Sequence, residues 1–407
     1  MKEFEVKTKI YFGDDALAHL GELKTDRVFI VADPFTVSSG LIDHITNPLK
    51  KNDISYSIFS KVVADPPVEV VIAGVKEALA CKGHYIVAVG GGSAMDTSKA
   101  IRKFATQIDE TYHPKLICIP TTSGTGSEVT SFAVISDTEH NTKIPLISDD
   151  MTPEEAILDE VLVKSVPKSI TADTGMDVIT HAMEAYVSLN GNEFSGALAA
   201  KSMEICGQFL LRSYNDNEDF HARRKVHVAS CLAGLAFNSA SLGLNHGMAH
   251  QLGAMFHIPH GRANAILLPY IIEYNSEISV FSRSKASYAP CVRKYCDLAR
   301  ILGVSNLNEV TTIRALVGYI QFLLHEMSIP LHISELNVVG EGDYMAAIEE
   351  MAEHALADRC TATNPRKPTK EDIIEIYKEI WQKKSDKRNP LIRRSFRSFA
   401  IGKVNFA

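Results

Sequence analysis

The sequence lacks several features that assign a protein to a specialised class. No apolar run reaches the roughly 18 residues that a membrane-spanning helix needs. The N-terminal segment alternates charged and apolar residues, without the apolar stretch of a signal peptide. The seven cysteines form no CxxC pair and are odd in number, which favours reduced thiols. The net charge of −7 offers no positive excess for nucleic acid or membranes. These absences predict an ordinary globular protein of the cytoplasm that binds neither nucleic acid nor membranes.

Internal repeats and low-complexity linkers are also absent, and only the C-terminal segment 383–407 departs from the average composition. It is basic, with Arg and Phe interleaved, a pattern that can mark an RNA or membrane-surface contact. We expect instead a poorly ordered extension without chemistry of its own.

The order of apolar segments predicts two domains. Short β-branched runs at 27–32, 85–89 and 115–119 alternate with helical patterns, which is typical of a doubly wound, mostly parallel sheet. From about residue 169 the strand pattern fades, and helical spacing dominates at 171–189, 195–214, 219–240, 262–275, 284–302, 308–327, 342–356 and 370–383. We therefore predict an α/β dinucleotide-binding domain over 1–168, an all-helical domain over 169–382 and the tail 383–407.

Three predicted strands end in segments suited to a nucleotide. Gly90, Gly91, Gly92 and Ser93 open a helix, where unpaired N–H groups and the helix dipole favour a phosphate, and Asp96 lies in the first turn. The loop beginning at Thr121 and Thr122 is dense in hydroxyls and glycines. Asp33 ends a third strand, where it can accept a hydrogen bond from a ribose 2′-OH or simply form an Asp-Pro turn. Two such loops suit a dinucleotide.

The densest group of histidines lies between Gly243 and Asn264. His246 and His250 are four residues apart and share one face of a predicted helix; Pro259 then interrupts it, which predicts that His260 lies on a loop. Upstream, Asp177 and His181 are also four apart. One carboxylate with two or three imidazoles suits a divalent metal ion such as zinc or ferrous iron. Together with a nucleotide domain, these residues predict metal-assisted hydride transfer between an alcohol and a nicotinamide cofactor.

Five ordered segments give the chain a family resemblance: VGGGSAMDTSKA at 89–100, PTTSGTGSEVT at 120–130, GMDVITHAMEAY at 175–186, GLNHGMAHQLGAMFHIPHGRANAILLP at 243–269 and CTATNPR at 360–366. From about Glu5 to Gln382 it resembles the iron-activated (group III) alcohol dehydrogenases. Their architecture, shared with dehydroquinate synthase, is a doubly wound dinucleotide-binding domain followed by an all-helical metal domain.

The resemblance implies a role for individual residues. Those implied to hold the metal are Asp177, His181, His246 and His260, and the one implied to pass a proton at the substrate is His250. The implied cofactor residues are Asp33, Gly90, Gly91, Gly92, Ser93, Thr121, Thr122, Val134 and Lys143, to which the helix position adds Asp96. Phe237 and Cys360 match positions that line the substrate pocket. Asp65 stands where the family has a cofactor-contacting Asn, which leaves that contact open.

The implied reaction interconverts short-chain primary alcohols such as ethanol, 1-propanol or butanol with their aldehydes, using NAD and one divalent ion, Fe2+ first and Zn2+ or Mn2+ as alternatives. His257 favours the ethanol and 1-propanol type. Alternatives are a dehydrogenase of 1,2-propanediol, 1,3-propanediol or glycerol, a dehydroquinate-synthase-like lyase, or a sensor that binds cofactor without turnover. We expect a homodimer or larger homo-oligomer, located in the cytoplasm or inside a bacterial microcompartment.

Overall fold

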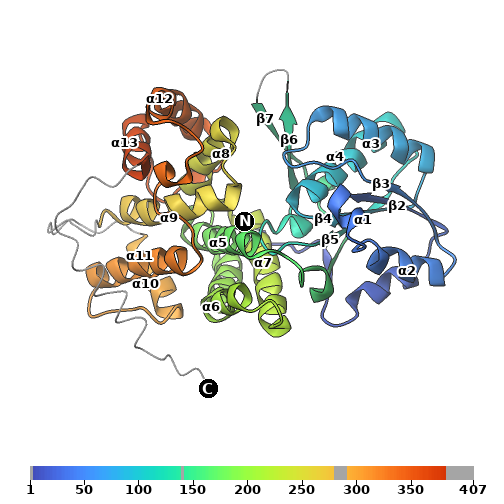
Figure 1. Cartoon of the computed structure of the whole chain (residues 1–407), viewed down its shortest axis with the longest axis horizontal. Helices are drawn as coiled ribbons and strands as arrows, with labels where there is room; N and C mark the ends of the chain where they lie inside the picture. Colours follow the sequence, from blue (N-terminus) through green and yellow to red (C-terminus); the bar gives the residue numbers. More distant parts are fainter. Residues whose placement is uncertain (1–2, 139–141, 279–290, 382–407) are drawn as a thin grey trace. The chain divides into compact units, whose positions relative to one another are not determined.

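A six-stranded parallel sheet forms the centre of the N-terminal half. The computed structural model describes residues 3–138, 142–278 and 291–381, so the tail 383–407 lies outside the described residues (Figure 1). The strand order is β1-β8-β5-β4-β2-β3. The strands are β1 (Lys9–Phe12), β2 (Arg27–Ala32), β3 (Ser55–Phe59), β4 (Tyr85–Gly90), β5 (Lys115–Pro120) and β8 (Glu155–Leu158). All their pairings are parallel, so the predicted doubly wound sheet is confirmed.

Apolar side chains cover both faces of this sheet. On β2, Phe29 and Val31 pack into one core cluster, whereas Val28 and Ile30 pack into the other. This alternation explains the continuous apolar runs, because a parallel strand with helices on both faces has no solvent side. The first cluster includes residues of α3 (Val68–Cys81) and α4 (Gly92–Ile108), and the second includes residues of α2 (Asp43–Lys51). Figure 1 shows α3 and α4 on the face opposite α2.

Two further elements of this half were not predicted. The short helix α1 (Pro34–Ser38) follows β2 directly. A separate hairpin of β6 (Phe132–Asp137) and β7 (Thr142–Ile147) is antiparallel, and Ser136 donates its backbone N–H to the carbonyl of Pro66. Turns of 3-10 helix complete the described chain at Ala16–Glu22, Ser127–Val129, Asp149–Met151, Glu160–Leu162, Ile333–Leu336 and Thr361–Thr363.

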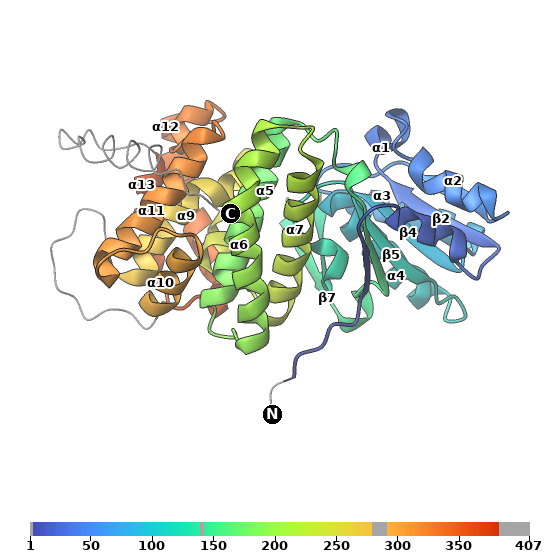
Figure 2. The same ribbon diagram turned by 90° about the horizontal axis from the view of Figure 1, so that it is seen from below.

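The C-terminal half is helical, as predicted. Its helices are α5 (Lys168–Val187), α6 (Glu193–Asn215), α7 (Phe220–Ala240), α8 (Leu244–Phe256), α9 (His260–Ser276), α10 (Val292–Ile301), α11 (Glu309–Glu326), α12 (Glu341–Ala357) and α13 (Lys370–Trp381). In Figures 1 and 2, α10 and α11 lie side by side. Among the described residues, no single helix has both the length and the apolar character for crossing a membrane; α7 and α8 meet that test only as a bent pair.

Internal contacts divide the chain into two compact units within α5. Among the described residues, the first contains those within 3–178 and 208–239, and the second contains those within 179–207 and 240–381. This division differs from the predicted boundary after residue 168, because α7 packs with the α/β elements. Gly126 has φ +62° and a carbonyl oxygen 2.6 Å from where a Cβ on Gly234 of α7 would lie, so only glycine fits there. Helical periodicity carries no sign of this long-range packing.

The buried carboxyl group of Glu128 gives the first unit a pH dependence that can be measured. Burial raises the pKa of Glu128 from 4.5 to about 7. Between these values the folded chain keeps a proton that the unfolded chain has released, so the free energy of unfolding falls as pH rises. The free energy of unfolding of Glu128→Gln, minus that of the parent, is expected to rise by up to about 3 kcal/mol as pH increases from 4 to 8. Chemical denaturation of both proteins across this range tests it; a constant difference would contradict the buried ionisation.

Candidate active site

The predicted cofactor segments meet at the carboxyl edge of the sheet. β5, β4 and β2 are neighbours, and Thr121, Gly91 and Asp33 follow their last residues. Thr121 donates its backbone N–H to the carbonyl oxygen of Gly90 at 2.9 Å. Ligands of open α/β sheets bind at this edge, in the crevice outside the strand ends.

Gly90 must be glycine for two reasons. Its φ is +150°, and a Cβ there would lie 2.7 Å from Ala94 Cβ and 2.9 Å from Asp33 Oδ2. The next residues begin α4, with Gly91 at the N-cap and no side chain capping it. No side chain therefore caps the first N–H groups of α4, and their role in holding a phosphate stays a prediction.

Asp33 caps a helix. Its Oδ1 accepts the backbone N–H of Thr36 at 2.7 Å, and its Oδ2 accepts the Thr36 hydroxyl at 2.9 Å. The Asp-Pro turn is thus present. A carboxylate oxygen has more than one lone pair, so these bonds leave room for a ribose hydroxyl. The cofactor role of Asp33 stays a prediction.

Asp96 ties together three of the predicted cofactor elements. Its carboxylate accepts the Ser127 hydroxyl at 2.8 Å and the backbone N–H of Val134 at 3.0 Å. It therefore joins α4 to the loop after β5 and to the β6-β7 hairpin. On that hairpin, Lys143 pairs with Asp65 at 2.7 Å, and Asp65 has the left-handed φ of 49°. The position that departs from the family pattern thus contacts a predicted cofactor residue.

Sequence reasoning missed Lys99, the buried cation beneath these loops. Its Nζ donates to Ser127 Oγ at 2.8 Å, Thr130 Oγ1 at 3.0 Å and the carbonyl of Phe132 at 2.8 Å. Burial lowers the pKa of Lys99, and the nearby Asp96 opposes that shift. A fully buried ammonium with three acceptors holds the loop after β5 against α4. Its position i+3 from Asp96 was the available signal.

The predicted metal ligands converge. Asp177 and His181 are one turn apart on the continuous helix α5, His246 lies on α8, and His260 begins α9. Each offers one ligand atom, and these atoms all lie within 4.8 Å of one another. One carboxylate and three imidazoles fit a divalent transition-metal ion.

The prediction that His260 lies on a loop is wrong, because His260 is the first residue of α9. Pro259 is the N-cap of this helix, a position that requires no N–H from proline. The exposed His257 ends α8 with φ 54°.

The surroundings keep His246 in the form that binds metals. Burial first, and then the neighbouring His181, His260 and His250, lower the pKa of His246 well below its ordinary value. The ring centroids of His181 and His246 are 4.6 Å apart. A neutral imidazole carries the lone pair that coordination needs, so this site favours a metal over a proton.

Two partners of the ligand histidines were missed. Glu184 Oε2 lies 2.5 Å from His246 Nδ1, and burial raises the pKa of Glu184 to about 8. The side-chain nitrogen of Asn264 lies 3.1 Å from Nε2 of both His246 and His260. Both had a sequence signal, since Glu184 continues the helical face of Asp177 and His181, and Asn264 is four residues after His260.

His250 belongs to a different group of side chains, which lies in the second unit. Its Nδ1 lies 2.8 Å from Asp358 Oδ2, and Asp358 also accepts the backbone N–H of Cys360 at 2.8 Å. Burial is the largest single influence on Asp358 and raises its pKa, but the hydrogen bond and charge of His250 and the hydrogen bonds from Cys360 together lower the net pKa. Asp358 therefore remains a carboxylate that orients the imidazole. Burial holds the pKa of the Cys360 thiol well above its ordinary value, so Cys360 is a neutral side chain rather than a nucleophile.

Phe237 lies in the first unit and Cys360 in the second. Phe237 is buried on α7, with its ring 5.6 Å from that of Phe132. Their shared role in lining a substrate pocket stays a prediction.

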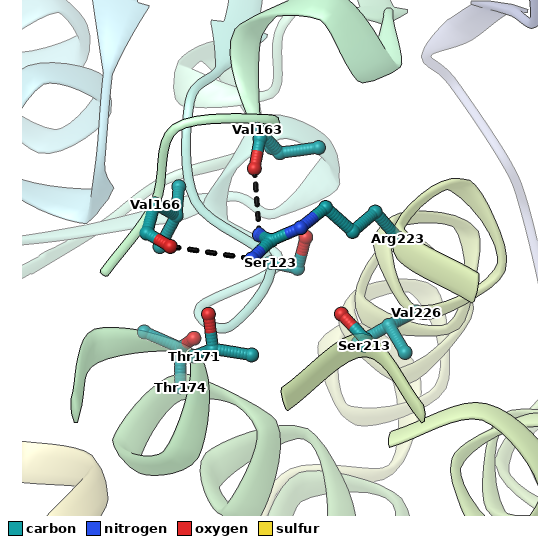
Figure 3. A pocket seen from close by; sticks show the side chains of 8 residues that line it. All are labelled: Ser123, Val163, Val166, Thr171, Thr174, Ser213, Arg223 and Val226. Atoms are coloured by element: carbon teal, nitrogen blue, oxygen red, sulfur yellow. Dashed lines mark hydrogen bonds between the residues drawn. The ribbon is translucent and has the colours of Figure 1, made fainter. Parts of the chain in front are cut away.

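A separate small pocket in the first unit contains none of the predicted site residues. Figure 3 shows its lining, which is Ser123, Val163, Val166, Thr171, Thr174, Ser213, Arg223 and Val226. The guanidinium of Arg223 donates to the carbonyls of Val163 at 2.8 Å and Val166 at 3.3 Å. It therefore fixes the segment between β8 and α5, which is a structural role.

Comparisons with known proteins match both halves of the chain. Residues 7–160 match the family described as iron-containing alcohol dehydrogenase, and residues 171–381 match the C-terminal part of the Fe-containing alcohol dehydrogenase family. A 1-propanol dehydrogenase, PduQ of Salmonella typhimurium, is 40% identical over 382 residues, which cover 93% of this chain and all of the relative. An NADPH-dependent butanol dehydrogenase of Clostridium saccharobutylicum is 33% identical, covering 94% of this chain and 98% of the relative.

Solved structures give the same match. A 1,3-propanediol oxidoreductase has a TM-score of 0.86 at 31% identity, covering 94% of this chain and all of that one. A sulfoacetaldehyde reductase from Bifidobacterium kashiwanohense, solved in complex with NAD+, has a TM-score of 0.81 at 26% identity, covering 94% of this chain and 99% of that one.

Proposed function

Because the chain belongs to the iron-containing alcohol dehydrogenase family, we propose that it interconverts short-chain primary alcohols and aldehydes with NAD(H) and one divalent ion, iron first. The observation that carries this proposal is the convergence of Asp177, His181, His246 and His260 within 4.8 Å. The relatives that act on 1-propanol and butanol support a substrate of this length.

When bound, the ion supplies Lewis-acid polarisation of the substrate oxygen and the nicotinamide carries the hydride. The chain supplies the rest. His250 donates its Nδ1–H to Asp358, so Nε2 is the ring nitrogen that exchanges the hydroxyl proton of the alcohol. The N–H groups at the start of α4 hold the cofactor phosphates, and Asp33 accepts from the ribose.

A panel of substrates tests this proposal. Metal-loaded protein is expected to oxidise NADH with acetaldehyde, propanal and butanal, and to reduce NAD with the matching alcohols. A polyol dehydrogenase is the second candidate, because of the likeness to 1,3-propanediol oxidoreductase. Higher kcat/KM for 1,2-propanediol, 1,3-propanediol or glycerol than for 1-propanol would favour it. No turnover with any of these compounds would overturn both candidates.

Asp33 is expected to set the preference for NAD over NADP, because its carboxylate repels a 2′-phosphate. Asp33→Gly should raise NADP efficiency relative to NAD about tenfold or more, which corresponds to about 1.4 kcal/mol. Asp33→Asn is the matched variant, since an amide oxygen can still cap α1 while the charge is gone. Kinetics with both cofactors decide: if neither variant changes the NAD-to-NADP ratio, Asp33 serves the turn alone.

The family resemblance also supports a homodimer or larger assembly, located in the cytoplasm or in a bacterial microcompartment. Light scattering on the purified protein measures the assembly, and a single-chain mass would contradict that part of the proposal. Imaging of the tagged chain in its own cell tests the location.

A further inference from the structure

We propose that Glu184 is a positioning residue that fixes the tautomer of His246 and thereby sets the affinity of the site for its metal ion. This inference rests on the proposed function, since it concerns the same ion. Glu184 lies on α5 and is 4% exposed, and His246 lies on α8 and is 1% exposed. Water therefore cannot replace either partner.

Both carboxylate oxygens of Glu184 are engaged at the start of α8. Oε2 lies 2.5 Å from His246 Nδ1, and Oε1 accepts the backbone N–H of Asn245 at 2.8 Å. A Cβ on Gly243 would lie 2.7 Å from Oε1, so a larger residue there would displace the carboxylate. Glu184 thus also caps a helix that has no side-chain cap at its own N-cap residue.

The hydrogen bond to Oε2 decides which ring nitrogen of His246 carries the proton. Burial raises the pKa of Glu184 to about 8 in the metal-free chain, and the charge of a bound divalent ion would favour its ionised form. With Nδ1–H donating to that carboxylate, Nε2 keeps its lone pair. Outer carboxylates orient metal-binding histidines in this way, and losing one commonly weakens metal binding about 10- to 100-fold.

The position of Asn264 supports the same tautomer independently. Its Oδ1 accepts from Asn245 Nδ2 at 2.9 Å, which turns its own NH2 group toward the histidines. That NH2 lies 3.1 Å from Nε2 of both His246 and His260. A donor facing these two atoms requires a lone pair on each. The two asparagines and Glu184 therefore specify one proton arrangement.

Glu184→Gln tests this assignment with almost no change in shape. The backbone N–H of Asn245 needs an acceptor, so the glutamine oxygen is expected to face it. The NH2 group then faces His246 Nδ1 and forces the proton onto Nε2, where it blocks coordination. Glutamine is thus expected to weaken metal binding by reversing the tautomer.

The experiment is a titration of metal-free protein with Zn2+ against a chromogenic chelator, which reads affinity without turnover. E184Q is expected to bind about 10- to 100-fold more weakly than the parent. Glu128→Gln is the control, because it makes the same change in a buried carboxyl group that belongs to neither histidine group. Its affinity should stay within about threefold of the parent, a difference of less than about 0.7 kcal/mol. Equal affinity of E184Q and parent would overturn the inference, whereas a parent that binds no metal would overturn the proposed function.

A second variant separates positioning from packing. Glu184→Asp keeps two acceptor oxygens and cannot force the wrong tautomer, so it should bind Zn2+ more tightly than E184Q. Equal weakening in both variants would show that only packing matters. Melting curves of the metal-free proteins show whether each variant is folded. If E184Q is unfolded, the Zn2+ affinity of E184D is compared with that of the parent instead. A loss of affinity above 100-fold in E184D would then contradict the tautomer assignment.

Discussion

Replacing Asp177 with alanine is expected to remove the metal ion and lower turnover about 100-fold or more, because the Lewis acid supplies several kcal/mol of transition-state stabilisation. Asp177 is the one carboxylate among four ligands and is 3% exposed. Without it, three neutral imidazoles hold a doubly charged ion with no compensating charge. The fold should persist, since α5 continues through this position.

Metal analysis, circular dichroism and kinetics on the purified Asp177→Ala protein check this result. Stoichiometric metal with near-normal turnover would contradict the ligand assignment. His246→Ala is expected to lose the metal as well. It should also cost more stability, because it leaves the buried carboxyl of Glu184 without the imidazole.

Replacing His250 with alanine is expected to leave metal and NAD bound but to slow alcohol oxidation near neutral pH about 100-fold or more, the range of general acid–base groups. His250 lies one turn from His246 on α8, and its partner Asp358 stays ionised because its pKa is lowered. The loss should shrink as pH rises, since hydroxide can then take the proton of the alcohol.

The pH–rate profile of metal-loaded His250→Ala beside the parent decides this point. Parallel profiles of similar height would mean that His250 only packs beside the site. Loss of the metal would mean that it is a ligand and that the roles of the histidines were divided wrongly. Asp358→Asn is expected to show a smaller loss with the same pH trend, because it leaves the imidazole in place but poorly oriented.

Local patterns in the sequence predicted the features that depend on neighbouring residues alone, namely helix-spaced pairs and buried strands. Asp177 with His181 and His246 with His250 are pairs four residues apart, and each pair lies on one helix. The same reasoning predicted β2, β4 and β5, since buried parallel strands read as apolar runs. It missed β3, whose SYSIF alternates exposed and partly buried residues at the sheet edge, and the four-residue β8.

What could not be predicted depends on contacts between distant segments. Glu184 and His246 are 62 residues apart, and His250 and Asp358 are 108 apart. No periodicity links such pairs, so the groups that orient the histidines emerged only from the structure. The boundary between the two compact units, inside α5, could not be predicted for the same reason. It depends on the packing of α7, which requires the close approach of two glycines distant in the sequence.

The most direct test of the central claim is aldehyde-dependent oxidation of NADH by one anaerobically purified sample, measured before chelation, after chelation and after Fe2+ or Zn2+ is restored. We predict one divalent ion per chain, propanal reduction that disappears with the ion, and recovery when it returns. Undiminished turnover by the fully metal-free protein would contradict the account.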